Sequence, residues 1–159
     1  MFWTSRNSSN HVGSVRRAGM DGWEPSEIVT GTFVPYGIAI DFQSSRLYWA
    51  DSRYNKVYSS NLEGTDLQVV IQVPGSGLTF GIALHGSRIY CTSLYTKKLQ
   101  SFSMDGQDYR VLHEDAYVLR HLAIISSRSD LPRNRTNHCA NQQCSNVCVL
   151  TPKSFRCVP

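Results

Sequence analysis

The chemistry that the sequence most clearly offers is that of cysteine. Cys91 stands alone, whereas the other four cysteines of the 159-residue chain are crowded near its end, as Cys139, Cys144, Cys148 and Cys157. Such a cluster forms either a disulfide framework or a metal site. A zinc site usually takes paired Cys-x-x-Cys ligands, or Cys with His, and the adjacent residues His138 and Cys139 would rarely both turn toward one ion. We therefore predict disulfides, no bound metal and an oxidising compartment.

Catalysis and nucleic-acid binding find no support in the sequence. It contains no Gly-x-Ser-x-Gly elbow, no His-Glu-x-x-His helix and no glycine-rich phosphate loop. The net charge of +4 is scattered, and the densest basic stretch, between Arg128 and Arg135, has no interleaved aromatic residues. No apolar run is long enough to cross a bilayer, and the first residues lack the pattern of a signal peptide. We predict no enzyme, no cofactor and no nucleic-acid partner.

Internal repeats organise the first 125 residues. Three markers return in the same order: an aromatic core, an acid–glycine pair and a small-then-apolar run. The aromatic cores contain Phe2 and Trp3, then Tyr48 and Trp49, then Tyr90. The acid–glycine pairs, each 42 residues after the last, are Asp21-Gly22, Glu63-Gly64 and Asp105-Gly106. The small-then-apolar runs are Gly37–Ile40, Gly81–Leu84 and, more weakly, His121–Ile124. Chance is a poor explanation for this agreement.

Each copy of the repeat predicts four short strands, which in the central copy cover 37–41, 47–51, 56–60 and 68–72. The acid–glycine pair follows the third strand, where glycine can take a positive φ without a Cβ clash. Four short strands at a period near 42 residues are typical of a β-propeller blade, which hides its faces against neighbouring blades. The first copy has extra polar residues around 7–10, so we expect an exposed hairpin loop there.

The central copy, with Tyr48-Trp49-Ala50-Asp51 followed by Glu63-Gly64, resembles the Tyr-Trp-Thr-Asp repeat, also called the LDL-receptor class B repeat. The resemblance implies a six-bladed propeller in which the motif aspartate ties adjacent blades together. Ser5 and Ser93 replace that aspartate in the other copies, so weaker contacts are expected there and only Asp51 keeps the full role. Cys91 replaces the motif tryptophan. We interpret it as a buried free thiol, with a bridge to another part of the protein as the alternative.

The predicted fold class is all-β: a partial β-propeller of about three of six blades, with a small disulfide-stapled EGF-like module. The expected propeller covers 1–126. It begins with an incomplete blade at 1–30, continues with a blade at 36–73 and another at 80–114, and ends with a closing strand at 119–125. A linker at 127–137 and a truncated EGF-like module at 138–159 complete the expected chain. Because three blades leave two open faces, we expect a fragment of a larger protein whose remaining blades are partners of these.

The cysteine tail matches the first four cysteines of an EGF-like module. That similarity implies the bridges Cys139–Cys148 and Cys144–Cys157, whereas four cysteines alone allow three connectivities. No acidic pair precedes Cys139, so we expect a module that does not bind calcium. Asn7-Ser8-Ser9 and Asn134-Arg135-Thr136 are N-glycosylation sequons in an expected loop and an expected linker.

The resemblance implies the ectodomain of an LDL-receptor-family plasma-membrane receptor. Such a glycoprotein would be a non-catalytic platform that binds or releases a lipoprotein, a secreted signalling protein or a matrix protein, in endocytosis or in Wnt-co-receptor-like signalling. Receptors of this kind release ligand in acidic endosomes, so His85 and His121, near the ends of inner strands, are candidate pH sensors. The alternative is a nidogen-like basement-membrane protein that binds laminin.

Overall fold

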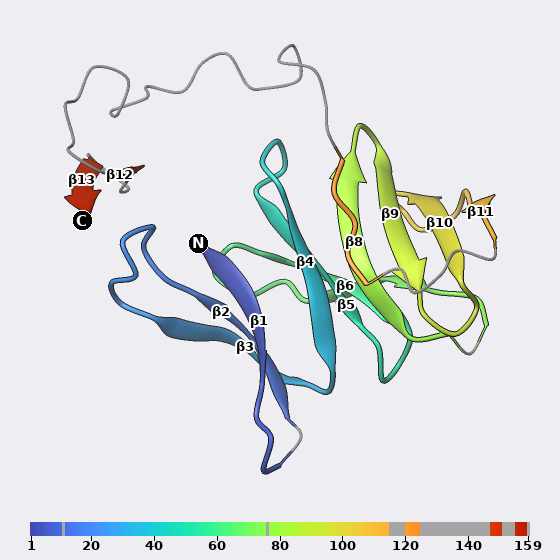
Figure 1. Cartoon of the computed structure of the whole chain (residues 1–159), viewed down its shortest axis with the longest axis horizontal. Helices are drawn as coiled ribbons and strands as arrows, with labels where there is room; N and C mark the ends of the chain where they lie inside the picture. The colour runs from blue at the N-terminus through green and yellow to red at the C-terminus, as the bar shows by residue number, and fades with distance from the viewer. Residues whose placement is uncertain (11, 76, 115–119, 125–146, 151–154, 159) are drawn as a thin grey trace.

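The computed structural model describes residues 1–10, 12–75, 77–114, 120–124, 147–150 and 155–158 (Figure 1). Every regular element within these ranges is a β-strand, and the chain is all-β as predicted. The described residues form no helix that is long and apolar enough to cross a membrane.

Three antiparallel sheets follow one another along the chain, each with its strands in sequence order. The first contains β1 (Phe2–Arg6), β2 (Gly13–Arg17) and β3 (Ser26–Thr32). The second contains β4 (Pro35–Asp41), β5 (Arg46–Asp51), β6 (Lys56–Asn61) and β7 (Gln68–Gln72). The third contains β8 (Thr79–His85), β9 (Arg88–Ser93), β10 (Lys98–Ser103) and β11 (Arg110–His113). The inner strand β4 contacts both β1 and β8, so the second sheet lies between the other two (Figure 1).

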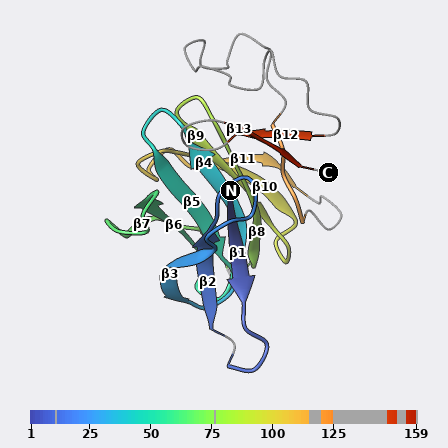
Figure 2. The same cartoon turned by 90° about the vertical axis from the view of Figure 1, so that its left-hand side faces the viewer.

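The extra polar residues of the first copy form a hairpin loop, as expected. β1 pairs with β2 from Phe2 opposite Arg17 to Arg6 opposite Gly13. The Asn7 N–H then donates to the Val12 carbonyl at 3.0 Å across the loop. Figure 2 shows this loop projecting from one end of the molecule, where additional residues disturb no strand.

The two aromatic residues of the central motif serve two different sheet contacts. Successive side chains of a strand point to opposite faces, so Tyr48 and Trp49 face different neighbours. Trp49 is fully buried in a cluster with Val15 and Val29 of the first sheet. Tyr48 is buried on the other face, in a cluster that includes Ile89 of the third sheet. The Tyr-Trp pair therefore lets one sheet pack on both sides.

The acid–glycine pairs are equivalent corners of the three sheets, between the third and fourth strands of the repeat. Gly22, Gly64 and Gly106 have φ values of +83°, +83° and +79°, which glycine adopts readily. A Cβ at Gly64 would lie 2.0 Å from the Ile28 carbonyl oxygen of the first sheet, and a Cβ at Gly106 would lie 2.3 Å from that of Val70 in the second. The Gly64 and Gly106 corners thus pack on the outer strand of the preceding sheet.

One expected strand differs from the structure. The sequence predicts a strand at 119–125, but residues 120–124 carry no strand assignment and pair with none of the described strands. A strand is recognised through its hydrogen bonds to a partner, and no partner for this segment is among the described residues. The segment lies beside Gly81 of β8, where an added Cβ would be 3.0 Å from the Leu122 nitrogen.

The cysteine tail is described only as a two-stranded hairpin. β12 (Val147–Leu150) pairs antiparallel with β13 (Phe155–Val158), and Cys148 lies directly opposite Cys157 in the register. Cys139, Cys144, Asn134 and the expected linker lie outside the described residues, so the EGF-like module and its two bridges stay predictions.

Truncating Trp49 tests the packing of the first sheet on the second. Trp49→Ala should lower the free energy of unfolding by about 3–5 kcal/mol, because it removes a fully buried aromatic side chain and leaves a cavity. Urea denaturation followed by circular dichroism measures the change. Trp23→Ala is the control, since Trp23 is 63% exposed and its loss should change stability by less than about 1 kcal/mol. Equal losses from both variants would contradict the assigned packing.

Candidate binding surface

The three sheets present two chemically different ends. The motif residues Asp51 and Ser93 lie at one end, here called the aspartate end, together with the connections β1–β2, β3–β4, β5–β6, β7–β8 and β9–β10. The corner glycines lie at the opposite end, here called the glycine end. The strands alternate in direction, which sorts the connections into these two groups (Figure 1).

Charge is segregated between the two ends. The five connections at the aspartate end contain neither Asp nor Glu, but they include Arg53 and Lys97. One described carboxylate, that of Glu114 directly after β11, lies at this end and pairs with Lys98 at 2.8 Å. The connections at the glycine end contain neither Lys nor Arg, and their carboxylates are Asp21, Glu24, Glu63, Asp66, Asp105 and Asp108. The aspartate end is therefore suited to an acidic partner and the glycine end is not.

Exposed aromatic rings accompany the positive charges at the aspartate end. Phe33 and Tyr54 meet edge to face with 5.1 Å between ring centroids, and the Lys56 ammonium lies 5.8 Å from the Tyr54 ring centroid. Tyr95, in the β9–β10 connection, is 69% exposed. Aromatic side chains and arginine are enriched at the centres of protein–protein interfaces, and this end offers Tyr95 and Arg53.

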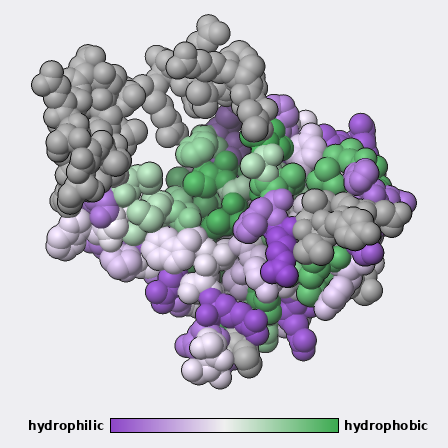
Figure 3. All heavy atoms as spheres, viewed as in Figure 1, coloured by the Kyte–Doolittle hydropathy of each residue, from purple (hydrophilic) through white to green (hydrophobic). Residues whose placement is uncertain are grey.

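A cavity of about 410 Å³ adjoins this end, between the inner strands β4 and β8 and residues 120–122. The Tyr36 and Phe80 rings, which stack on each other with 4.1 Å between centroids, form part of its wall, and Arg120 and His121 also line it. Figure 3 shows hydrophobic side chains gathered at the centre of the visible face, over β4 and toward β8. The cavity is lined by apolar side chains, with the Arg120 guanidinium and the His121 imidazole beside them.

Asp51 fixes the connections that carry the aromatic rings. Its carboxylate is 1% exposed and accepts hydrogen bonds from the Phe33 N–H at 2.8 Å and the Arg53 N–H at 2.9 Å. The N–H groups of Val34 and Tyr54 are each 3.4 Å from the same carboxylate. One buried side chain thus joins the connection between the first two sheets to the β5–β6 turn.

Ser93 holds the matching position in the third sheet and makes no such link. Its Oγ is buried and has no hydrogen-bond partner among the described residues. The Gly77 backbone instead packs closely on it, because a Cβ at Gly77 would lie 1.8 Å from the Ser93 Oγ. With serine in place of aspartate, the third sheet lacks the carboxylate that joins the two connections in the second.

Asn55 is a linking residue that the sequence reasoning missed. Its Nδ2 donates to the carbonyl oxygens of Val73 at 3.0 Å and Gly75 at 2.7 Å, and its Oδ1 accepts from the Thr79 Oγ1 at 2.6 Å. These bonds join the second sheet to the third. The sequence offered one signal, an asparagine in the turn between the second and third strands of the repeat. In the structure Asn55 has a φ of +54°, which asparagine adopts more readily than most residues.

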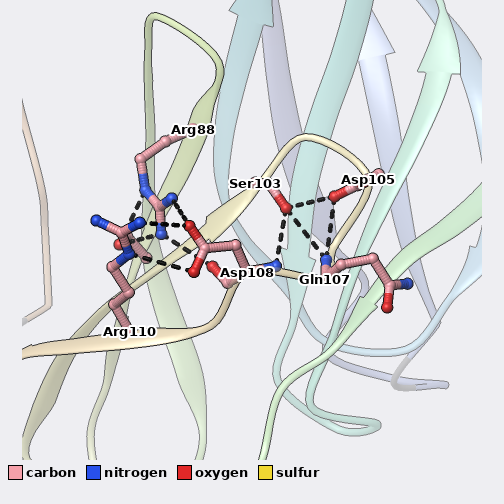
Figure 4. Close-up of polar contacts among 7 residues, drawn as sticks. Arg88, Ser103, Asp105, Gln107, Asp108 and Arg110 are labelled. Atoms are coloured by element: carbon pink, nitrogen blue, oxygen red, sulfur yellow. Dashed lines mark hydrogen bonds and ion pairs between the residues drawn. The ribbon is translucent and has the colours of Figure 1, made fainter.

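A repeated arginine is a second residue type that was missed, at the glycine end. Arg88 Nη1 lies 2.6 Å from Asp108 Oδ2 (Figure 4). The Arg88 Nη2 donates to Ser101 Oγ at 2.9 Å. The second sheet repeats this arrangement 42 residues earlier with Arg46, Asp66 and Ser59. The sequence did contain a signal for it, because the arginine, the serine and the aspartate each recur after 42 residues.

These ion pairs give two carboxylates of the glycine end, those of Asp66 and Asp108, partners within the protein. Hydrogen bonds from Arg110 and Arg88 hold the pKa of Asp108 below its ordinary value. Hydrogen bonds from Arg46 and Gln68 do the same for the pKa of Asp66. Both carboxylates therefore stay ionised at neutral pH and lose their pairing only as the pH falls through these lowered pKa values.

The remaining candidate residues lie in separate places. Asn7 is exposed in the β1–β2 loop at the aspartate end. His85 is exposed at the glycine end of β8, opposite Arg88, whereas His121 lines the cavity, so the structure does not bring the two histidines together. Cys91 is fully buried, and burial raises the pKa of its thiol to about 12.

The residues of the repeat motif also fall into two groups. Phe2 packs with the cluster between the first two sheets, as Tyr48 packs with the cluster between the second and third. Trp3 and Tyr90 are half-buried. Trp3 follows Phe2 in the same strand, so its side chain points to the opposite face, away from the second sheet. Tyr90 is the third-sheet counterpart of Tyr48, so its side chain also points away from the second sheet.

Comparison with solved structures identifies the fold. The chain is similar to a chain of a nidogen–laminin complex, with a TM-score of 0.59, 24% identity and coverage of 73% of this chain and 49% of that chain. It is also similar to regucalcin, a calcium-binding protein from Agrobacterium tumefaciens, with a TM-score of 0.59, 14% identity and coverage of 69% and 40%. The sheets are β-propeller blades. The chain is thus a partial propeller of three blades, as the sequence predicted.

Sequence comparison points to receptors. The chain is 28% identical over 155 residues to the vitellogenin receptor Yl of Drosophila melanogaster, which covers 94% of this chain and 7% of the receptor. It is 26% identical over 167 residues to the vitellogenin receptor of Solenopsis invicta, covering 99% of this chain and 9% of the receptor. The chain therefore spans less than a tenth of either relative. No family model matches. These findings support blades of the LDL-receptor class B type.

Removing the carboxylate of Asp51 tests the link between the first two blades. Asp51→Ala should cost roughly 2–4 kcal/mol of unfolding free energy, because buried N–H groups lose a charged acceptor. Ser93→Ala is the matched control at the equivalent position and should cost less than about 1 kcal/mol, since its Oγ has no partner among the described residues to lose. Chemical denaturation of both variants measures the difference. Equal costs would contradict the assigned role.

Proposed function

We propose that this chain is part of the ectodomain of an LDL-receptor-family cell-surface receptor, where it is a non-catalytic platform that binds a protein ligand for endocytosis. The observation that carries the proposal is the similarity of nearly the whole chain to two vitellogenin receptors. The proposal includes an extracellular location and a longer receptor chain that contributes further parts.

The aspartate end is the surface proposed to meet the ligand. Its five connections between strands contain no carboxylate, the nearby Glu114 is paired with Lys98, and the connections present exposed rings beside cationic side chains. Asp51 and Asn55 hold these connections from within, so the rings are presented on a fixed backbone, which lowers the entropy lost on binding. The ligand chemistry that fits is an acidic protein segment with apolar side chains between its carboxylates.

Release of the ligand in endosomes is a finer part of the same proposal. His121 lines the cavity next to the aspartate end, whereas His85 lies at the opposite end of its strand. His121 is therefore the better placed of the two candidate pH sensors. Substitution of His121 by Gln, compared with the same substitution at His85, separates their contributions to release between neutral and endosomal pH.

Binding to purified proteins tests the surface and the ligand class together. The secreted chain should bind vitellogenin, and Arg53→Ala with Tyr95→Ala should weaken that binding at least about tenfold, since Arg and Tyr side chains dominate interface energies. Surface plasmon resonance at two salt concentrations measures the affinity. Phe42→Ala with Gln43→Ala is the control, because it removes a ring and a polar group from the glycine end.

Laminin serves as the second probe in the same assay. Binding of laminin without vitellogenin would favour the nidogen-like matrix protein instead of the receptor. Vitellogenin binding that is unchanged by the Arg53 and Tyr95 substitutions, but lost in the control variant, would contradict the choice of end.

Glycosylation is a separate test of the extracellular proposal. Asn7 is exposed in the β1–β2 loop, and its Oδ1 accepts the Ser9 N–H at 2.8 Å, which leaves the amide nitrogen open to a glycan. Peptide mass spectrometry of material secreted from insect cells should find glycans on Asn7 and Asn134, and Asn7→Gln should remove one of them. Two unmodified asparagines in secreted protein would count against it.

A further inference from the structure

Four buried polar atoms of the third blade have no hydrogen-bond partner among the described residues. They are the Ser93 Oγ, the Thr96 Oγ1 and both the Nε2 and the Oε1 of the Gln100 amide. Ser93 and Gln100 are each 1% exposed, so bulk solvent does not supply their hydrogen bonds. Buried polar groups of native proteins nearly always have a partner, which is either another protein group or an ordered water. The Gln100 amide requires both a donor and an acceptor.

The Gln100 and Ser93 side chains lie in the contact between the second and third blades. Gln100 of β10 is directly opposite Cys91 of β9, so the two side chains share one face of the sheet. That face packs on the second blade, because Cys91 belongs to the buried cluster that also contains Tyr48 and Val57. Ser93 follows Cys91 by two residues in the same strand, so its side chain points to the same face.

The β7–β8 connection closes this contact at the aspartate end. A Cβ at Gly77 of that connection would lie 1.8 Å from the Ser93 Oγ and 3.1 Å from the Thr96 Cγ2. Asn55 holds the same connection in place, since its Nδ2 donates to the Gly75 carbonyl oxygen at 2.7 Å. The Ser93 and Thr96 hydroxyl oxygens are both buried. They therefore lie on the inside of the contact, close to the backbone that joins the two blades.

The same positions of the second blade carry different chemistry. Trp49 and Tyr58, the counterparts of Cys91 and Gln100, stack with 5.8 Å between ring centroids. The carboxylate of Asp51 accepts backbone N–H groups at 2.8 and 2.9 Å. In the third blade a thiol, an amide and a hydroxyl stand at these three positions. The contact between the second and third blades thus contains small polar groups where the preceding contact has two rings and a bonded carboxylate.

These polar groups suit a small neutral ligand. Burial raises the pKa of the Cys91 thiol to about 12, so the thiol is protonated at neutral pH, and the amide and hydroxyls are neutral as well. The part of the chain that the structure describes has no group of three His, Cys, Asp or Glu residues that could hold a metal ion. Water both donates and accepts, and a buried water typically makes about three hydrogen bonds to groups that otherwise lack them.

We propose that the contact between the second and third blades is a buried water site, in which water bonds to the Gln100 amide and to the Ser93 hydroxyl. The third blade is then joined to the second through water, whereas the second is joined to the first through stacked rings and Asp51. Because the side chains around the site are buried, this water exchanges with bulk solvent only when the two blades separate locally. The inference does not rest on the proposed receptor function.

Nuclear magnetic resonance of the ¹⁵N-labelled chain tests the site without any substitution. The Gln100 side-chain amide, assigned through its own Cβ and Cγ, should show cross-peaks to water in both NOE and ROE spectra. The two cross-peaks should have opposite signs, which is the signature of a long-lived bound water, whereas chemical exchange gives the same sign in both. The side-chain amide of Gln107, an exposed residue of the same blade, is the control and should show no such pair of cross-peaks.

Magnetic relaxation dispersion of ¹⁷O-labelled water tests the site in variants, because it counts long-lived waters. Gln100→Met removes the amide and keeps an unbranched side chain of similar size, so the variant should fold and should hold at least one long-lived water fewer. Gln107→Met is the matched control at an exposed position and should leave the count unchanged. Ser93→Ala should shorten the residence time of the water several-fold, since the water then makes one hydrogen bond fewer.

A folded, unmodified chain whose Gln100 amide shows no bound-water signature would overturn the proposal, and this outcome requires no variant to fold. Equal counts of long-lived water in the Gln100→Met and Gln107→Met chains would overturn the assignment of the water to this contact. An unchanged residence time in Ser93→Ala would overturn the part assigned to Ser93. None of these measurements involves vitellogenin or laminin, so failure of this inference is distinguishable from failure of the proposed receptor function.

Discussion

The packing of one sheet on the next is the constraint on which the rest of this structure depends. A short four-stranded sheet is apolar on both faces, and it can remove both from water only between two neighbours. The second blade does so, with Trp49 buried toward the first blade and Tyr48 toward the third. The corner glycines permit this distance, since a side chain at Gly64 or Gly106 would strike the neighbouring backbone.

Polar groups then fix how the blades are connected. Asp51 and Asn55 each bond to a connection that leads from one blade to the next, and both are buried. Burying a carboxylate or amide costs free energy unless its hydrogen bonds are made, so the bonds of these two residues favour one course of the chain at that end. The same end carries the exposed rings and cations.

The two internal contacts between blades are not equal. Trp49 lies opposite Tyr58 and stacks on it with 5.8 Å between ring centroids. The third blade has Cys91 opposite Gln100 at these positions, and both polar atoms of the buried Gln100 amide lack partners among the described residues. Ser93 also leaves its hydroxyl unpaired. The contact between the first and second blades also contains an unpaired buried group, the Trp49 Nε1, so the two contacts differ in which polar groups they leave without partners among the described residues.

The sequence by itself determined the repeat, the strands and their corners. Period-two alternation around Tyr48 and Trp49, and glycine at a fixed distance after them, are local properties, so they could be predicted with the hairpin loop at residues 7–10. Only the tertiary structure decided which side chains link the blades and how charge divides between the ends. Asn55 reaches Thr79 and Arg88 reaches Asp108 across turns whose three-dimensional course no local pattern specifies. Residues 120–124 make the same point, because whether an apolar run becomes a strand depends on the partner that the assembled fold offers it.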